Sequence, residues 1–400
     1  MENEINVIIR WILEQILLPV FISSVIIIFL QDKLRGLKEK IKPKPYVAVL
    51  ISEKDNPNFD VPKDFRYGFK LADEYKKYFE DKRNTRIQID YSHDDDLDEN
   101  KTNTVIRKLI DDTKCIMIIG NVTSTLTMKN VEEIIASKKK IPLIMPIATD
   151  NYILEKARKN GMNGILRVLP DNSKQTAKIM SFITQVIKPE KPIIVFSDDD
   201  NEIYSKNFSP LIIKELIKQN IPYIEIHIGR KNNLSLTNEA ISKYKSASAI
   251  IYVGISTNAV FLINQLQLND ISVPLIMTDG CLVSEVYQLI KDKYKGKCYV
   301  SSSVKYDRDA KYTNIGIDTY KICKKILNEC YGTRESVYKY IDEHKTEIEI
   351  ENYKFNTEGN NSLGEYTIYP VIDGKLGDEI TIKSSNSYSE MLNGNETTIE

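Results

Sequence analysis

The chain has 400 residues, of which 42% are hydrophobic and 28% charged, and 55 lysines and arginines against 56 aspartates and glutamates give a net charge of −1. This composition excludes a disordered or collagen-like chain, and the length suits about two or three domains. The lack of net positive charge argues against a nucleic-acid partner. The five cysteines are widely spread without a Cys-x-x-Cys, so neither a disulfide framework nor a zinc site is expected.

The first 44 residues differ in character from the rest of the chain. Residues 11–30 contain one charged residue, Glu14, and at about 1.5 Å per residue they match the roughly 30 Å hydrocarbon core of a bilayer. We predict an uncleaved transmembrane helix there, because the acidic start and the lack of a small-residue cleavage site do not fit a signal peptide. A basic linker follows at 33–44, and the positive-inside rule then predicts that the large C-terminal part lies in the cytoplasm.

From residue 45 onward, short β-branched runs alternate with amphipathic stretches. The predicted strands are 46–51, 86–91, 115–120, 142–147, 192–197, 222–228, 249–254, 274–278 and 298–301. The predicted helices between them are 63–79, 102–110, 128–136, 174–186, 207–218 and 258–266. This alternation predicts an α/β fold with parallel sheets and right-handed crossovers. One large sheet is an alternative, but two Rossmann-like lobes fit ordinary domain sizes better.

The pattern changes toward the C-terminus. Residues 313–330 and 334–342 read as helices, and 346–355 and 366–371 read as strands on either side of a Gly/Asn turn at 359–361. The last segment, 381–400, is polar and poor in aromatic residues, so we predict a disordered tail.

No motif in the chain indicates catalysis. The sequence contains no phosphate-binding or dinucleotide-binding glycine motif, no nucleophile elbow, and no histidine with a second metal ligand at a suitable spacing. The carboxylate runs at 94–96 and 198–200 lack the spacing of a calcium loop and are interpreted as solvated loops. We therefore expect a protein that is not an enzyme and has no cofactor.

Polar loops follow several predicted strands at the points where helices begin. They cover 121–127, 149–151, 197–205, 256–258 and 279–280. In open α/β sheets, ligands bind at the carboxyl ends of the strands, on free helix-start N–H groups and short side chains. The candidate site is therefore this set of loops, in which hydroxyl groups predominate.

The order of these segments resembles the type I periplasmic binding protein fold, in the branch of leucine/isoleucine/valine-binding solute receptors of ABC transporters. The resemblance is carried by 67–79, 87–94, 106–120 followed by VTSTLT, 145–151 (MPIATDN), 167–172, 195–204, 253–254, 277–280 (MTDG), 313–330 and 355–374. It covers about 45–380 and implies two lobes joined by three crossovers, near Pro170, Ser303 and Gly359. The lobes would be 45–170 with 304–358, and 171–303 with 359–380.

The resemblance also implies site residues. Ser124 resembles the serine that holds an amino acid's carboxylate, and Ala148 and Thr149 resemble the backbone-and-hydroxyl pair after the fourth strand. Tyr204 resembles a tyrosine of the second lobe that covers the ligand, and Asp279 resembles the acid that pairs with the ligand's ammonium. Thr123 and Ser256, in the same loops, complete the predicted set. The alternative is that Ser124 and Thr149 are helix caps and Asp279 a turn residue.

Together these expectations describe a membrane-anchored sensor whose two lobes close on an amino acid or similar small polar ligand. Its partners would be that ligand, the membrane, and a second copy or a membrane protein. One alternative is an extracytoplasmic solute-binding protein of an ABC amino-acid transporter. Another is a membrane-tethered interaction module whose cleft no longer binds.

Overall fold

The computed structural model describes residues 44–52, 61–75, 79–80, 86–201, 203–229, 238–303 and 311–382, together with Gln31. The chain separates into two compact units, Met1–Lys44 and Pro45–Glu400. The predicted transmembrane helix and most of the basic linker and of the C-terminal tail lie outside the described residues. Within the described ranges, no helix combines the length and the apolar character needed to cross a membrane.

The second unit contains two large sheets, one in each lobe. In lobe 1 the order is β2-β3-β1-β4-β5-β6, formed by Phe79–Glu80, Arg86–Asp90, Tyr46–Val49, Cys115–Ile119, Leu143–Met145 and Ile165–Arg167. In lobe 2 the order is β15-β14-β11-β10-β9-β7-β8, formed by Lys375–Leu376, Thr367–Ile372, Cys298–Ser302, Leu275–Met277, Ala249–Val253, Ile193–Asp198 and Tyr223–Ile228. Pairing is parallel except at the edges, where β2, β14 and β15 run antiparallel to their neighbours.

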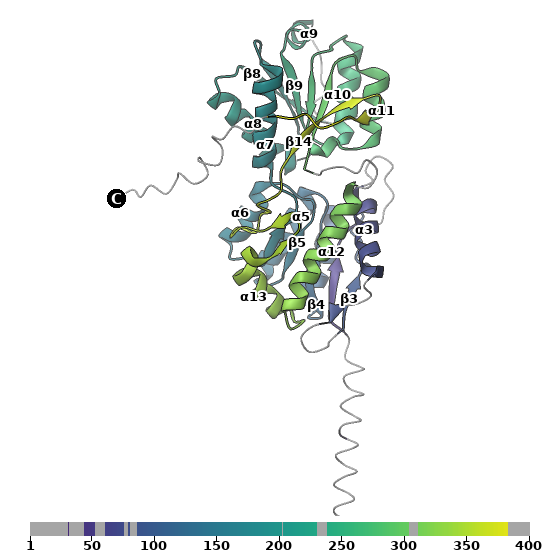
Figure 1. Ribbon diagram of the computed structural model, residues 1–400, viewed down its shortest axis with the longest axis vertical. Helices are drawn as coiled ribbons and strands as arrows, with labels where there is room; N and C mark the ends of the chain where they lie inside the picture. Colours follow the sequence, from purple (N-terminus) through teal and green to yellow (C-terminus); the bar gives the residue numbers. More distant parts are fainter. Residues whose placement is uncertain are drawn as a thin grey trace, which may run out of the picture. The chain divides into compact units, whose positions relative to one another are not determined.

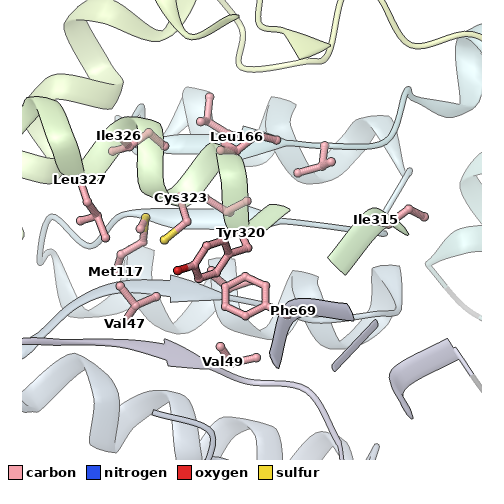
Figure 2. Packing of buried hydrophobic residues seen from close by; sticks show 14 of the residues in the cluster. Val47, Val49, Phe69, Met117, Leu166, Ile315, Tyr320, Cys323, Ile326 and Leu327 are labelled. Carbon is pink, nitrogen blue, oxygen red and sulfur yellow. The ribbon is translucent and has the colours of Figure 1, made fainter. Parts of the chain in front are cut away.

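Helices cover both faces of the lobe 1 sheet. One face packs against α3 (Val61–Tyr75), α12 (Lys311–Glu329) and α13 (Arg334–His344), and the other against α4 (Glu99–Asp111), α5 (Ser124–Ser137) and α6 (Asn151–Lys159). Figure 2 shows the first of these clusters, in which Tyr320 and Cys323 of α12 lie near Val47 and Met117 of the sheet. Segments more than 200 residues apart in the sequence therefore share one core.

The two helices α3 and α12 lie side by side (Figure 1) at very short range. A methyl group on Gly316 would stand 2.2 Å from the carbonyl oxygen of Phe65, and one on Gly68 would stand 1.9 Å from that of Thr313. Each helix therefore carries a glycine where the backbone of the other approaches, and a larger residue would force the helices apart.

The lobe 2 sheet is covered in the same way. Helices α7 (Asn172–Phe182) and α8 (Tyr204–Lys218) pack on one face. Helices α9 (Asn238–Lys245), α10 (Ser256–Leu268) and α11 (Ser284–Lys293) pack on the other. Both lobes thus have helices on both faces of a mostly parallel sheet, and the predicted α/β class is confirmed.

Two of the segments that join the lobes are described, and they are bonded to each other. The chain leaves lobe 1 after β6, and it returns to lobe 2 after a small hairpin formed by β12 (Glu349–Ile350) and β13 (Tyr353–Lys354). The amide of Asn361 donates to the carbonyl of Val168 at 2.9 Å, and the hydroxyl of Tyr366 donates to that of Pro170 at 3.1 Å.

A lysine of lobe 2 strengthens this junction. The ammonium of Lys174, in the first turn of α7, donates to the carbonyls of Ser362 at 2.7 Å and Gly364 at 2.8 Å. A third, longer bond of 3.3 Å goes to the carbonyl of Asn361. We call Lys174, Asn361 and Tyr366 the crossover clamp. The third joining segment, after Ser303, lies outside the described residues.

Three local predictions differ from the structure. The predicted helix 63–79 ends at Tyr75, and Phe79 begins β2 instead. The predicted strand 346–355 is a 3₁₀ turn followed by the β12–β13 hairpin, because Glu351 adopts a left-handed backbone (φ 46°) that reverses the chain. The strand β6 was not predicted, since it has only three residues and ends in the charged Arg167.

Candidate functional site

The predicted site residues all follow the C-terminal ends of strands. They follow β4 (Thr123, Ser124), β5 (Ala148, Thr149), β7 (Tyr204), β9 (Ser256) and β10 (Asp279). Ser124, Ala148, Thr149, Tyr204 and Ser256 are buried, and Thr123 and Asp279 are partly exposed. The loops therefore hold these side chains at the sheet edge where ligands bind in such folds.

At the β4–α5 loop, the helix is capped by Thr123. Its hydroxyl accepts a hydrogen bond from the backbone N–H of Leu126 at 3.3 Å, and its backbone is extended, as a cap requires. Ser124 is the first residue inside α5. The alternative that Ser124 is the cap is therefore wrong, and its hydroxyl lies beside the helix start without serving that role.

The β5–α6 loop repeats this arrangement with a different capping residue. Asp150, rather than Thr149, caps α6, since one carboxylate oxygen accepts from the N–H of Tyr152 at 2.7 Å. The carbonyl of Thr149 accepts from the N–H of Asn172, which begins α7, at 3.0 Å. The starts of α6 and α7 therefore adjoin each other.

A buried arginine holds the backbone of this loop. The guanidinium of Arg167 donates to the carbonyl of Thr149 at 2.9 Å and to that of Asp150 at 2.5 Å. Its complete burial lowers its pKa, while the nearby Asp171 and Asp150 act in the opposite direction. Arg167 was not predicted as a site residue, although an arginine within an apolar run is a signal for a buried, hydrogen-bonded side chain.

In lobe 2, the structure brings two predicted residues together. The phenol of Tyr204, at the start of α8, donates to a carboxylate oxygen of Asp279 at 2.5 Å. Burial, and then the charge of Asp279, raise the pKa of Tyr204 well above its usual range, so the phenol remains a donor. The interaction fixes the position of Asp279 more firmly than a turn alone would.

The loop that contains Ser256 is held by a buried carboxylate. Asp198 accepts from the amide of Asn258 at 2.6 Å, from the hydroxyl of Tyr252 at 3.2 Å and from the N–H of Ile255 at 3.3 Å. Burial raises the pKa of Asp198, and these donors lower it. The interpretation of 198–200 as a solvated loop is wrong for Asp198, because its neighbours turn it inward.

The other carboxylate run also contains a buried member. Asp95 accepts from the N–H of Leu97 at 3.1 Å, from the hydroxyl of Thr102 at 3.0 Å and from the amide of Asn121. The solvated-loop interpretation is therefore wrong for Asp95 as well. Within the described residues, no group of three histidine, cysteine, aspartate or glutamate side chains is placed to hold a metal ion, and the five cysteines are buried and free.

Contacts between the lobes involve the first turns of α8. The hydroxyl of Thr125 in α5 donates to the side-chain oxygen of Asn201, just before α8, at 3.4 Å. The side chain of Asn207 in α8 donates a hydrogen bond to the carboxylate of Asp150, which favours the charged form of that group. The candidate loops of the two lobes therefore meet at the start of the helix that carries Tyr204.

No family model and no curated protein matches the chain. Solved structures match over 84% of it: the leucine-binding protein LivK of Thermotoga maritima has a TM-score of 0.69 and 16% identity over 98% of its own chain. The branched-chain amino acid transporter substrate-binding protein LivJ of Streptococcus pneumoniae, solved with isoleucine, gives 0.66 and 15% over 99%. A periplasmic binding protein type 1 of Bordetella pertussis gives 0.67 and 14% over 100%. The chain has the fold of the type I periplasmic binding proteins.

This likeness confirms the predicted fold of paired α/β lobes. These neighbours are named as binding proteins. At 14–16% identity, the likeness concerns the fold and leaves the ligand of this chain to be argued from its own residues.

Proposed function

We propose that the chain is a solute-binding protein of the kind that serves ABC transporters, with lobes that close on a small amino-acid-like ligand. The observation that carries this proposal is the structural likeness to LivK and LivJ, which spans nearly the whole of each of those chains. This likeness favours a transporter binding protein over the sensor predicted from the sequence, because LivJ is named as the substrate-binding protein of a transporter.

The chemistry of the loops supports an amino acid as ligand. Ser124 and Thr149 lie at the starts of α5 and α6, where helix N–H groups and hydroxyls favour a carboxylate. In the other lobe, Asp279 is held by Tyr204 and supplies a negative charge for an ammonium. Lobe closure would bring both halves of a zwitterion to complementary groups.

A thermal-shift assay of the full chain against the common amino acids tests this function. A ligand present at about 100 times its Kd stabilises a protein by roughly 2.7 kcal/mol and raises its Tm by several degrees. We expect Asp279→Ala and Ser124→Ala to abolish the shift, and Ser137→Ala, at the other end of α5, to preserve it. A folded protein that responds to no amino acid would contradict the proposal and favour the interaction module.

The membrane-anchored sensor remains a second candidate because of the apolar segment 11–30 and the basic linker after it. The two functions place the large unit on opposite sides of the membrane. Alkaline phosphatase fused to the C-terminus is active only outside the cytoplasm, so an active fusion supports the transporter function. An inactive phosphatase fusion together with a fluorescent cytoplasmic reporter supports the sensor and the predicted cytoplasmic location.

A further inference from the structure

Three side chains at the start of α8, in lobe 2, contact lobe 1. The first is Asn201, whose side-chain oxygen accepts from the hydroxyl of Thr125 in α5 at 3.4 Å. The same oxygen accepts from the N–H of Tyr204, the first residue of α8, at 3.3 Å. Asn201 therefore supports the start of its own helix and bonds to the other lobe.

The second side chain is apolar. Ile203 belongs to lobe 2, yet it packs against the buried lobe 1 cluster that lies between the sheet and helices α4, α5 and α6. Separation of the lobes would expose the apolar surfaces that this contact removes from water, and such exposure is unfavourable. Ile203 therefore favours the arrangement in which the lobes are together.

The third side chain meets a buried charge. Asn207 donates a hydrogen bond to the carboxylate of Asp150, which caps α6 and is fully buried. Hydrogen bonds to charged groups make a larger net contribution to stability than bonds between neutral groups, because they are stronger than the water contacts that they replace. We call Asn201, Ile203 and Asn207 the closing residues.

The closing residues border the predicted ligand contacts of both lobes. In lobe 2, Tyr204 directly follows Ile203 in the chain. In lobe 1, the bonded residues Thr125 and Asp150 directly follow Ser124 and Thr149. Each polar closing contact thus joins the start of α8 to the immediate neighbour of a predicted contact in lobe 1.

We propose that the closing residues are positioning residues: they hold the lobes together without a ligand and so regulate the affinity of the site. The regulation rests on the proposed solute-binding function, since it concerns the ligand of that same site. A ligand that requires the closed form binds with an apparent Kd that rises as the closed fraction falls. Loss of the closing contacts should therefore separate the lobes and weaken binding.

Double electron–electron resonance on the ligand-free full chain measures the separation of the lobes. The five natural cysteines are buried, so spin labels attach selectively to Asn100→Cys in α4 and Glu285→Cys in α11, both at exposed positions near helix starts. We expect a single short distance in the parent chain and a longer, broader distribution in Asn207→Leu. The matched control is Asn264→Leu in α10, whose amide donates to the carbonyl of Val260 in its own helix at 3.0 Å.

An exchange of the bonded groups separates positioning from folding. Asn207→Asp alone opposes two carboxylates, and Asp150→Ser keeps an oxygen to cap α6 but removes the carboxylate, so both should lengthen the distance. Asparagine caps helices as well as aspartate does. The double variant Asp150→Asn with Asn207→Asp therefore keeps the cap and restores a donor opposite a carboxylate. We expect it to recover the short distance, which independent structural roles of the two residues would not produce.

The apolar contact has its own pair of variants. Ile203→Ser removes the side chain that packs on lobe 1, and it should lengthen the distance. Ile217→Ser changes an isoleucine near the other end of α8 that is 58% exposed, and it should keep the parent distance. Equal distances in the two variants would contradict the role of Ile203.

Titration calorimetry with the twenty common amino acids tests the regulation. For an amino acid that binds, we expect Asn207→Leu to raise the Kd by about tenfold, and Asn264→Leu to leave it unchanged. An unchanged Kd in Asn207→Leu would overturn the regulation of affinity.

The distances need no ligand, so failure of this inference is distinguishable from failure of the proposed function. The parent distance in both Asn207→Leu and Asn207→Asp would overturn the inference and leave the solute-binding function standing. Equal lengthening in Asn264→Leu and Asn207→Leu would also overturn it, because the effect would then not depend on contact with lobe 1. Variants that open as expected in a chain that binds no amino acid would support the hold on the lobes and contradict the binding function.

Discussion

Two loops of lobe 1 each bury a carboxylate completely, and they differ in the donors that the carboxylate has. Both oxygens of Asp95 have donors, from Leu97 on one side and from Thr102 and Asn121 on the other. Asp150 accepts from the N–H of Tyr152 in its own loop and from the side chain of Asn207 in the other lobe. The two equally buried carboxylates therefore differ in where their donors lie: those of Asp95 come from lobe 1, whereas Asp150 also has a donor from lobe 2.

The electrostatics of the two carboxylates follow the same division. Burial raises the pKa of both, and hydrogen bonds offset this rise in part. At Asp150 the rise reaches about 6, despite Asn207, the capping N–H groups and Arg167 nearby.

The largest expected effect concerns the support of the Asp150 loop. Replacing Arg167 with Met removes one donor from each of the carbonyls of Thr149 and Asp150 and a positive charge beside the carboxylate of Asp150, so we expect a loss of about 3–5 kcal/mol in the free energy of unfolding, measured in urea. The control Arg107→Met breaks an exposed pair with Glu133 and should cost less than about 1 kcal/mol. Equal losses would show that the loop does not depend on Arg167.

The next effect separates the two carboxylates directly. Asp95→Ala removes the side-chain acceptor of the Leu97 N–H and of the buried amide of Asn121, and we expect it to lower the free energy of unfolding by about 2–3 kcal/mol. The nearby surface variant Glu99→Ala should change it by about 0.5 kcal/mol or less. If Asp95→Ala and Asp150→Ser changed the free energy of unfolding equally, the difference in hydrogen bonding between the two carboxylates would not affect stability.

The third expected effect is a pH dependence. Because the folded pKa of Asp150 lies above its usual value of 3.8, the folded state binds more protons than the unfolded state between about pH 4 and pH 6. The contribution of Asp150 to stability therefore falls as pH rises through this window, by at most about 3 kcal/mol. The contribution of Asp150 is obtained by subtracting the free energy of unfolding of Asp150→Ser from that of the wild type at each pH. A difference that increases with pH would contradict the raised pKa of Asp150.

The fold could be predicted from the sequence because its signals are local. Runs such as 115–120 and 249–254 are uniformly apolar, as strands covered on both faces must be. The β12–β13 hairpin escaped prediction because strands of two residues carry no periodicity, and β6 escaped because its apolar residues end at the charged Arg167. Antiparallel β14 also pairs with β11 from almost 70 residues away, which no local pattern reveals.

The site was predictable in place but not in detail. The polar residues after the strand ends identified these loops. The hydrogen bonds that position each side chain join segments that lie far apart in the sequence, so they could not be predicted. Asp150 and Asn207, and Tyr204 and Asp279, lie 57 and 75 residues apart. Asp95 and Asp198 were predicted to be solvated because their hydrogen-bond donors, Asn121 and Asn258, lie in other loops.

The crossover clamp has a mechanical consequence. Asn361 and Tyr366 bond one joining segment to the other, and Lys174 attaches the second to α7. Two separate segments could each twist and let the lobes swivel independently, but segments bonded along their length bend together as a single ribbon. We therefore expect a rotation of one lobe relative to the other to occur about a single axis at these two bonded segments, with little sliding of the lobes.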